Sequence, residues 1–223
     1  MTLRVAVLGG SKGCARHMVA QGLETGKYEF ILLVRNPDQV DYNEEQKAKL
    51  TLIKGDALDA SAVKQTVEGC DLVVFAIGST ITATFKMTHP GLCQKGMNVL
   101  LNVIKGMEHP PKRLIAVTTT GAMDPKEVPL LFRPLYHWAL AEPHADKREV
   151  ENSIQSSSHP FDWIIVRPSL LTDGALTQHY RAESNRLVGY TISRQDVGHF
   201  LLNQCLDDDE AKKWINNYVV VTY

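Results

Sequence analysis

Short apolar runs alternate with stretches of helical character along almost the whole 223-residue chain, and this alternation constrains the fold most strongly. The runs are continuous and rich in Val, Leu and Ile, which is typical of strands buried on both faces of a parallel sheet. Neighbouring parallel strands need a crossover connection, usually a right-handed one through a helix. The alternation therefore predicts an α/β fold of the Rossmann type, with a doubly wound parallel sheet in a three-layer α/β/α arrangement.

The expected elements follow from the positions of these runs. Strands are expected at 3–8, 30–34, 50–53, 72–77, 113–118, 162–166, 189–192 and 218–221. Helices are expected at 14–25, 61–67, 91–105, 144–155 and 196–206. Asp59 is placed to cap the second helix and Gly26 to end the first.

Length and composition are those of one ordinary globular domain spanning 1–223. The chain is 44% hydrophobic and 22% charged, and a domain of this length buries a large core. Its formal net charge of -1 gives no field that would favour nucleic acid or an anionic membrane, and no apolar run is long enough to span a bilayer. The N-terminus lacks a basic leader followed by a cleavage site, so we expect a cytoplasmic protein. As a partner we expect a small-molecule substrate. Monomer and homodimer both stay open.

The cysteines and histidines do not predict a metal site. Cys14, Cys70, Cys93 and Cys205 are widely spaced and form no CxxC pair, so we expect free thiols in a reducing compartment rather than disulfides. The histidines do not show the spacing of metal ligands, and we expect no metal.

A glycine-rich turn, GGSKGCA at 9–15, lies between the first expected strand and the first expected helix. Gly9 permits a tight turn off the strand, and Gly13 lets the backbone approach a pyrophosphate closely. The first N–H groups of the helix then face the phosphates. The alternative is a glycine-rich turn that has lost its ligand. The predicted dinucleotide site begins with Gly9, Gly10, Ser11, Lys12, Gly13 and Cys14.

The residue after the second expected strand distinguishes NADP from NAD. Sites for NAD usually have an acidic residue there, which accepts a hydrogen bond from the ribose 2′-OH. This chain has Arg35, and a guanidinium attracts the 2′-phosphate that a carboxylate would repel. Lys12, within the turn, adds a second positive charge. Either residue alone could be a solvated surface cation, but both together favour NADP(H) as the cofactor.

Residues after the later strands complete the predicted cofactor site. Asp56 is expected to accept from the adenine amino group, and Ala76 and Gly78 are expected along the adenosine ribose. The neighbouring residues assigned to the same site are Ala57, Ile77 and Thr118.

The least regular stretch is 124–143, where prolines stand among apolar residues that show no clear periodicity. Prolines limit helix length, so this stretch suits a lid over a pocket. The alternative is an ordinary packed connection. Together with 169–193, we expect it to form the substrate pocket.

The order and spacing of short motifs resemble the atypical short-chain dehydrogenase/reductase family, in its NAD(P)H-binding or NmrA-like group with a biliverdin-reductase-like branch. The turn has GxxxGxA spacing, similar to the GxxxGxG of that family, with Ala15 in the third position. The other motifs are LVR at 33–35, GD at 55–56, AIG at 76–78, TTTGA at 118–122, DP at 124–125, VP at 128–129, KREVE at 147–151, VRP at 166–168 and ISRQDVG at 192–198. The resemblance covers nearly the whole chain.

The resemblance implies roles for individual residues. Thr119 corresponds to a Ser or Thr near the nicotinamide, Lys147 to a lysine that binds the nicotinamide ribose, and Pro168 to a residue beside the carboxamide. His144 corresponds to a histidine near the substrate and is the candidate proton donor, because the ordinary pKa of histidine is near neutrality. Thr119, His144 and Lys147 are therefore the candidate catalytic residues. For His144, the alternative is a position at a helix N-terminus, exposed to solvent or hydrogen-bonded to the backbone.

Simpler structural roles remain open for several residues of these motifs. Lys147 could form a surface pair with Glu151, one helical turn away. Arg167 could anchor a buried carboxylate. Ser193 is expected to cap the last long helix, with Asp196 in its first turn.

One departure from the family pattern bears on the chemistry. Standard short-chain enzymes carry Tyr-x-x-x-Lys, in which the tyrosine donates a proton, but here Pro143 stands four residues before Lys147. A flavin, a linear tetrapyrrole or another conjugated acceptor can take its proton from water. We therefore expect an NADPH-dependent oxidoreductase that reduces a small conjugated, flavin-like, quinone or carbonyl substrate. The alternatives are a non-catalytic NADP-sensing NmrA-like regulator and an NAD(P)-dependent epimerase or dehydratase.

Overall fold

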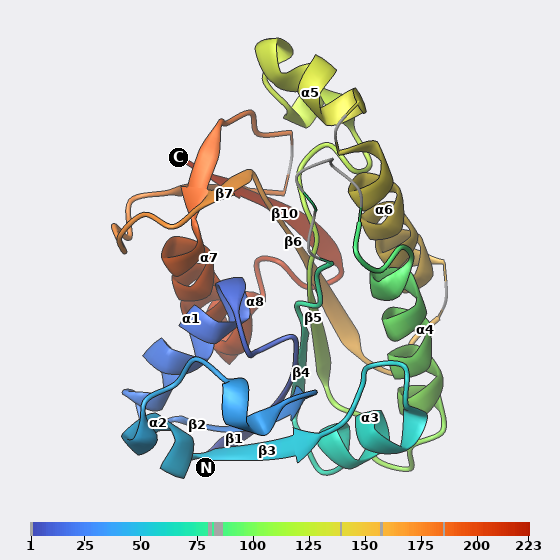
Figure 1. Ribbon diagram of the computed structural model, residues 1–223, viewed down its shortest axis with the longest axis vertical. Coiled ribbons are helices and arrows are strands. Elements are labelled where there is room, and N and C mark those ends of the chain that lie inside the picture. Colours follow the sequence, from blue (N-terminus) through green and yellow to red (C-terminus); the bar gives the residue numbers. More distant parts are fainter. Residues whose placement is uncertain (1, 80–81, 83–86, 139, 157, 185) are drawn as a thin grey trace.

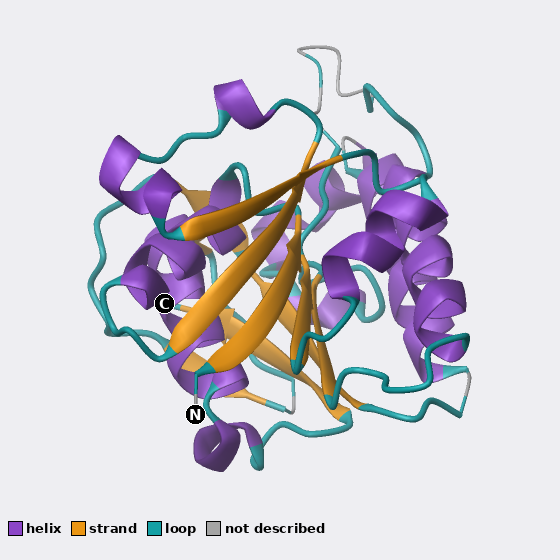
Figure 2. Ribbon diagram, turned by 90° about the horizontal axis from the view of Figure 1, so that it is seen from below, coloured by secondary structure: helices purple, strands orange, loops and turns teal. Residues whose placement is uncertain are grey.

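A large, mostly parallel sheet forms the centre of the computed structural model, which describes residues 2–79, 82, 87–138, 140–156, 158–184 and 186–223. The strands of this sheet are β1 (Leu3–Leu8), β2 (Tyr28–Val34), β3 (Leu50–Lys54), β4 (Leu72–Phe75), β5 (Arg113–Val117), β6 (Asp162–Pro168), β8 (Arg181–Glu183) and β10 (Asn217–Thr222). Their spatial order is β3-β2-β1-β4-β5-β6-β10-β8. All neighbours are parallel except β10 and β8, which are antiparallel. Figure 2 shows the strands as a twisted fan, because neighbouring strands of a sheet are rotated in one direction relative to each other.

Helices cover both faces of the sheet (Figure 1). One face is covered by α1 (Gly13–Leu23), α7 (Arg194–Phe200) and α8 (Asp208–Ala211). The opposite face is covered by α3 (Ala60–Val67), α4 (Leu92–Lys105) and α6 (Ala141–Gln155). Two short helices, α2 (Glu44–Ala48) and α5 (Arg133–Trp138), stand outside these layers. The predicted three-layer α/β/α fold of the Rossmann type is confirmed.

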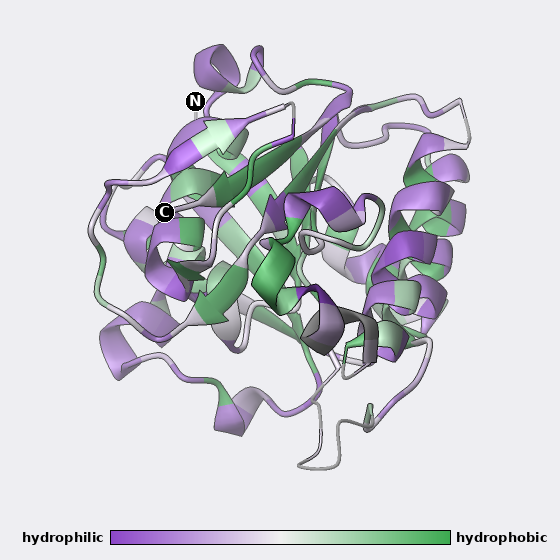
Figure 3. Ribbon diagram, turned by 90° about the horizontal axis from the view of Figure 1, so that it is seen from above, coloured by the Kyte–Doolittle hydropathy of each residue, from purple (hydrophilic) through white to green (hydrophobic). Residues whose placement is uncertain are grey.

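The two faces of the sheet bury two separate apolar cores, and β1 contributes to both. Val5 and Val7 pack in the core under α1 and α7, whereas Ala6 and Leu8 pack in the core under α3, α4 and α6. Successive strand side chains point to opposite faces, so a continuous apolar run is what a doubly covered strand requires. Figure 3 shows the result as apolar strands enclosed by helices whose outer faces are hydrophilic.

Several expected boundaries were wrong in ways that have local causes. The strand expected at 189–192 is β9 (Thr191–Ser193), which pairs with β7 (Leu170–Thr172) in a separate two-stranded sheet. Strands of three residues such as β7 and β8 carry too little periodicity to be recognised. The helix expected at 196–206 begins at Arg194 and continues as a π-helical turn, Leu201–Leu206.

The helix expected from 144 begins three residues earlier, and Pro143 lies in its first turn. Proline is tolerated there because the N–H groups of a first turn have no partner within the helix. The expected irregular stretch therefore ends inside α6. Before α6 it forms short 3₁₀ turns, Pro125–Glu127 and Leu130–Phe132, and then α5.

Two expected helix caps are confirmed. The Asp59 carboxylate accepts hydrogen bonds from the N–H groups of Ser61 at 2.9 Å and Ala62 at 3.4 Å at the start of α3. The Ser193 hydroxyl accepts from the N–H of Asp196 at 2.9 Å at the start of α7. Within the described part of the chain, no helix is both long enough and apolar enough to cross a membrane.

The Asp59 cap provides a test of this local structure. Asp59→Ala is expected to lower the free energy of unfolding by about 1 kcal/mol, because two N–H groups of α3 lose their acceptor. Chemical denaturation followed by circular dichroism measures the change. Glu68→Ala, at the other end of the same helix, is the control and should change stability by less than half as much. Equal losses in both variants would contradict a capping role.

Candidate functional site

A cleft of about 520 Å³ opens where the strand order reverses between β1 and β4. Open α/β sheets bind ligands outside the carboxyl ends of their strands at such a point. Most residues of the predicted cofactor site line it, namely Gly9, Ser11, Lys12, Gly13, Cys14, Arg35, Asp56, Ala57, Ala76, Ile77, Gly78, Thr118 and Lys147. The lining residues that the sequence analysis missed are Leu33, Val34, Gly55, Ser79, Leu92, Val117, Leu171 and Arg194.

The glycine turn brings backbone, rather than side chains, to the floor of the cleft. Gly9 has a φ of 97°, and a Cβ at this position would lie 2.6 Å from the backbone carbonyl of Ala76 at the end of β4. Gly13 has a φ of 69°, and a Cβ there would project into open space. Lys12 forms no side-chain cap at the start of α1. The first N–H groups of α1 are therefore left without a capping side chain at the cleft, as an anion site requires.

Gly10 belongs to the turn but not to the lining of the cleft. A Cβ at Gly10 would lie 2.9 Å from the Val7 side chain, so the residue is packed against the core. Its carbonyl accepts a hydrogen bond from the buried Tyr42 hydroxyl at 2.6 Å, and burial raises the pKa of that hydroxyl. Gly10 thus anchors the turn to the core on the side away from the cleft. Tyr42 gave no signal in the sequence, because it follows an irregular stretch with no periodic pattern.

The cleft is electropositive. Among the described residues that line it, Lys12, Arg35, Lys147 and Arg194 are cationic and Asp56 is acidic. The Asp56 carboxylate accepts from the N–H of Leu58 at 2.9 Å. The sequence analysis treated the ISRQDVG motif as a helix start and so missed Arg194, which pairs with Asp173 at 2.7 Å.

The side chain of Lys147 reaches across two strand ends at the cleft. Its ammonium donates to the carbonyls of Ile77 at 2.7 Å and Val117 at 2.9 Å. The alternative surface pair with Glu151 is therefore wrong, because Glu151 is buried and bonded elsewhere. Three donors are available on an ammonium, so one remains to face the cleft.

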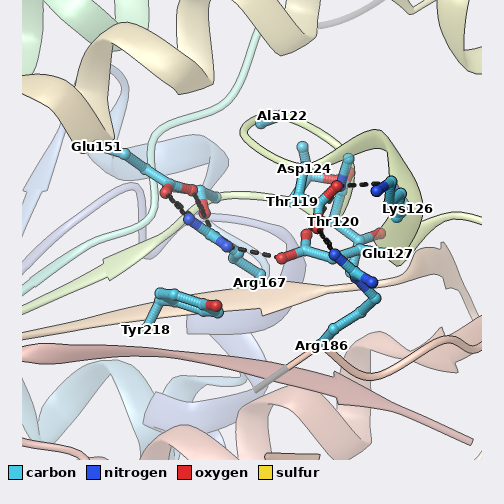
Figure 4. A network of polar contacts seen from close by, with 12 residues as sticks. Thr119, Thr120, Ala122, Asp124, Lys126, Glu127, Glu151, Arg167, Arg186 and Tyr218 are labelled. Carbon is cyan, nitrogen blue, oxygen red and sulfur yellow. Dashed lines mark hydrogen bonds and ion pairs between the residues drawn. The ribbon is translucent and has the colours of Figure 1, made fainter. Parts of the chain in front are cut away.

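A buried ion cluster supports the cleft from behind (Figure 4). The Arg167 guanidinium donates to Glu151 at 2.5 Å and to Glu127 at 2.7 Å, and it lies 3.8 Å over the Tyr218 ring. All three charged side chains are at most 4% exposed. The expectation that Arg167 anchors a buried carboxylate is confirmed, and a second carboxylate joins it.

The cluster fixes the segment that follows β5. Thr118, which lines the cleft, donates its hydroxyl to Glu151 at 2.6 Å, and the N–H of Gly121 donates to Glu127 at 3.1 Å. With two carboxylates and one guanidinium the cluster is one cation short, and burial raises the pKa of Glu127.

Besides Gly10, three predicted site residues lie outside the lining of the cleft. Thr119 is half-buried and its hydroxyl donates to the carbonyl of Thr120 at 3.4 Å, while Pro168 is buried at the end of β6. His144 is buried and lines a different, smaller cavity. Burial and the nearby Arg148 lower the pKa of His144 to about 4, so the imidazolium needed by the expected proton donor is scarce at neutral pH.

Cys14 lines the cleft as an inert thiol. Burial raises its pKa to about 12, so the nucleophilic thiolate is not populated at neutral pH. Cys70, Cys93 and Cys205 are likewise buried and free. Among the residues with described positions, no three His, Cys, Asp or Glu side chains come together as a metal site would require.

Comparison with known proteins connects this cleft to a family. A family model described as NAD(P)H-binding matches residues 9–209. The chain belongs to the NAD(P)H-binding family. Two fungal relatives are each 28% identical to it: the reductase pytE of Aspergillus terreus, over 98% of this chain and 97% of the relative, and the oxidase pynE of Aspergillus niger, over 98% of both. The family and these relatives support an NAD(P)-dependent oxidoreductase.

Solved structures share the fold. A short-chain dehydrogenase/reductase from Veillonella parvula in complex with NADP superposes with a TM-score of 0.76 at 16% identity, covering 100% of this chain and 95% of that one. ChuY, an anaerobillin reductase from Escherichia coli O157:H7, superposes with a TM-score of 0.73 at 18% identity, covering 98% and 96%. At such identities the likeness concerns the fold.

The close approach of Gly9 to the end of β4 predicts that a side chain at this position disturbs cofactor binding. Gly9→Val is expected to weaken binding of NAD(P)H by about tenfold or more, because its side chain would push the turn away from Ala76 and strain a left-handed φ. Isothermal calorimetry on the folded protein measures the affinity. Gly106→Ala, at the end of α4, is the control, because a Cβ there meets nothing closer than 3.6 Å. Unchanged affinity in Gly9→Val would contradict the assigned role of the turn.

Removal of the central cation tests the buried cluster. Arg167→Met is expected to lower the free energy of unfolding by about 3–5 kcal/mol, because two buried carboxylates then face each other without a cation. Denaturant titration measures the loss. Arg186→Met is the matched control: its pair with Asp124 is exposed, so a loss below about 1 kcal/mol is expected. If Arg167→Met lowered the free energy of unfolding by no more than the control does, the cluster would not be needed for stability.

Proposed function

We propose that this chain is an NADPH-dependent oxidoreductase that reduces a small conjugated acceptor, such as a flavin-like, quinone or carbonyl compound. The observation that carries the proposal is the cationic cleft. Arg35 directly follows β2 and Lys12 directly precedes α1, and both line the cleft. In NAD sites the position after β2 is usually acidic, so a cation there supports a phosphorylated ribose.

The fit of a dinucleotide rests on the lining residues. The cradle at Gly9 admits no side chain, and the N-terminus of α1 offers N–H groups for a pyrophosphate. Arg35 and Lys12 would hold the 2′-phosphate, and Asp56 would accept from the adenine. Lys147, tied to the ends of β4 and β5, would reach the nicotinamide ribose with its remaining donor. The bound cofactor supplies the hydride.

The protein's own contribution to the chemistry is then mainly positioning. Pro143 lies where standard short-chain enzymes have their tyrosine, and the lowered pKa of His144 leaves little imidazolium at neutral pH. Conjugated acceptors suit such a site, because they can take a proton from water after hydride transfer. Thr119 and Pro168 remain our predicted neighbours of the nicotinamide.

A second function is supported by the same feature. Without the tyrosine, the protein could bind NADP(H) as a sensor and turn nothing over, like NmrA-like regulators. Steady NADPH oxidation with any acceptor from a panel of quinones and flavins would exclude the sensor. Tight binding without oxidation would exclude the reductase.

Cofactor preference tests the role of Arg35. Arg35→Ala is expected to weaken NADPH binding about tenfold or more while changing NADH binding little, because the lost charge-assisted hydrogen bonds involve the 2′-phosphate. Calorimetric titration with both cofactors measures the ratio of affinities. Arg4→Ala is the control: Arg4 lies at the start of β1 and pairs with Glu29 at 3.4 Å. An equal effect of Arg35→Ala on NADPH and NADH would refute the preference for NADP.

A further inference from the structure

A second cavity, of about 260 Å³, lies beside the start of α6. Its lining residues are Gly121, Pro125, Val128, Arg133, Ala141, His144, Ala145 and Arg148. The cavity and the cofactor cleft are adjacent along two elements. The segment after β5 contributes Thr118 to the cleft and Gly121 to the cavity, and α6 contributes Lys147 to the cleft and Arg148 to the cavity.

Within the described part of the chain, two arginines of this cavity are each held in place by one contact with a backbone carbonyl. The Nε of Arg148 donates to the carbonyl of Ala122 at 2.7 Å, and the Nε of Arg133 donates to the carbonyl of Val128 at 3.2 Å. Each guanidinium has five N–H donors, so its terminal amino groups remain available. Each of the two arginines is therefore oriented by one hydrogen bond and keeps further N–H donors for a ligand.

The carboxylates near the cavity are committed to other groups. Asp124 pairs with Arg186, and Glu127 pairs with Arg167. Glu142 accepts from the N–H of Met87, and Asp146 accepts from the N–H groups at the start of α4. Over the part of the chain that the structure describes, neither Arg133 nor Arg148 forms an ion pair.

The remaining lining residues describe the shape of the ligand. Pro125, Val128, Ala141 and Ala145 are small and apolar, and the neutral His144 adds no charge. A cavity with two oriented guanidinium groups and apolar walls matches an organic acid better than a free inorganic ion. Guanidinium groups recognise carboxylates through paired hydrogen bonds in one plane.

We infer that this cavity binds the carboxylate end of an organic acid, held by Arg133 and Arg148, while the rest of the molecule extends along α6 toward the cofactor cleft. The segment that carries these contacts is held by the buried cluster, since Gly121 is bonded to Glu127. The identification of this acid as the acceptor of the hydride rests on the proposed function. The binding of a carboxylate does not.

The first experiment measures binding without cofactor. Benzoate is titrated into the full-length protein and followed through the arginine side-chain N–H signals in nuclear magnetic resonance spectra, with benzamide as the neutral isostere and inorganic phosphate as a third probe. Benzoate is expected to shift the Arg133 and Arg148 signals and to bind about tenfold or more tighter than either other probe. Equal binding of benzamide, or tighter binding of phosphate, would overturn the inference.

Variants separate specific contacts from general charge. Arg133→Gln and Arg148→Gln are each expected to weaken benzoate binding about tenfold, and Arg148→Lys less so, because lysine keeps the charge but loses the fork. Arg4→Gln removes an arginine that also donates to a backbone carbonyl, that of Gly69, at the opposite end of the sheet. It should bind benzoate as the unmodified protein does. Loss of binding in Arg4→Gln as large as in Arg148→Gln would overturn the assignment.

The second experiment tests the acid as a substrate. NADPH oxidation is measured with 1,4-naphthoquinone-2-carboxylate and with its methyl ester. Arg148→Gln is expected to raise KM for the acid about tenfold with kcat changed less than about twofold, and to leave KM for the ester unchanged. Equal KM values for acid and ester in the unmodified protein would overturn the substrate assignment while leaving the reductase in place. Benzoate binding without oxidation of NADPH by any acceptor would remove the reductase and leave the carboxylate site.

Discussion

The reversal of strand order between β1 and β4 places the chain on opposite faces of the sheet after two adjacent strands. After β1 the chain turns into α1 on one face, and after β4 it leads to α4 on the other. The two exits can lie this close only because Gly9 carries no side chain against the carbonyl of Ala76. The space between them is the cleft, and every residue proposed to hold the cofactor is positioned relative to it.

The buried Arg167 cluster links the cleft to the second cavity. Through Glu151 it bonds Thr118 on the cleft side, and through Glu127 it bonds Gly121 on the cavity side. Burying three charges is costly, and apolar residues of the same volume are often as stable. The ions instead position the backbone, because each of these hydrogen bonds fixes one point of the segment after β5. The cluster therefore positions both sites with the same few contacts.

Helix α6 serves the two sites with neighbouring residues. Lys147 turns toward the strand ends, whereas His144 and Arg148 face the second cavity. Residues three and four apart lie along one side of a helix, so positions 144, 147, 148 and 151 form a continuous stripe. Pro143 directly precedes this stripe, in the first turn of α6.

Local pattern could predict much of the fold and most of the described residues that line the cofactor cleft. The apolar runs gave β1 to β6 and β10, since a doubly buried strand has a continuous signature. The expected lid stays a prediction: Leu130, Leu131 and Trp138 are 75%, 80% and 84% exposed, and the described residues of 124–143 that line a pocket line the second cavity rather than the cofactor cleft. Apolar composition without periodicity indicates neither which surface a segment covers nor whether it covers any.

The sequence by itself determined the parallel sheet, the glycine turn and the cations at Lys12 and Arg35, because each depends on residues that are neighbours along the chain. Only the tertiary structure decided the partners of Lys147 and the second carboxylate on Arg167. It also decided that Arg133 and Arg148 line the same cavity. Those contacts join residues from different elements, and their distances depend on how helices pack on the sheet. Burial, which lowers the pKa of His144, is likewise a property of that packing and is invisible in the order of residues.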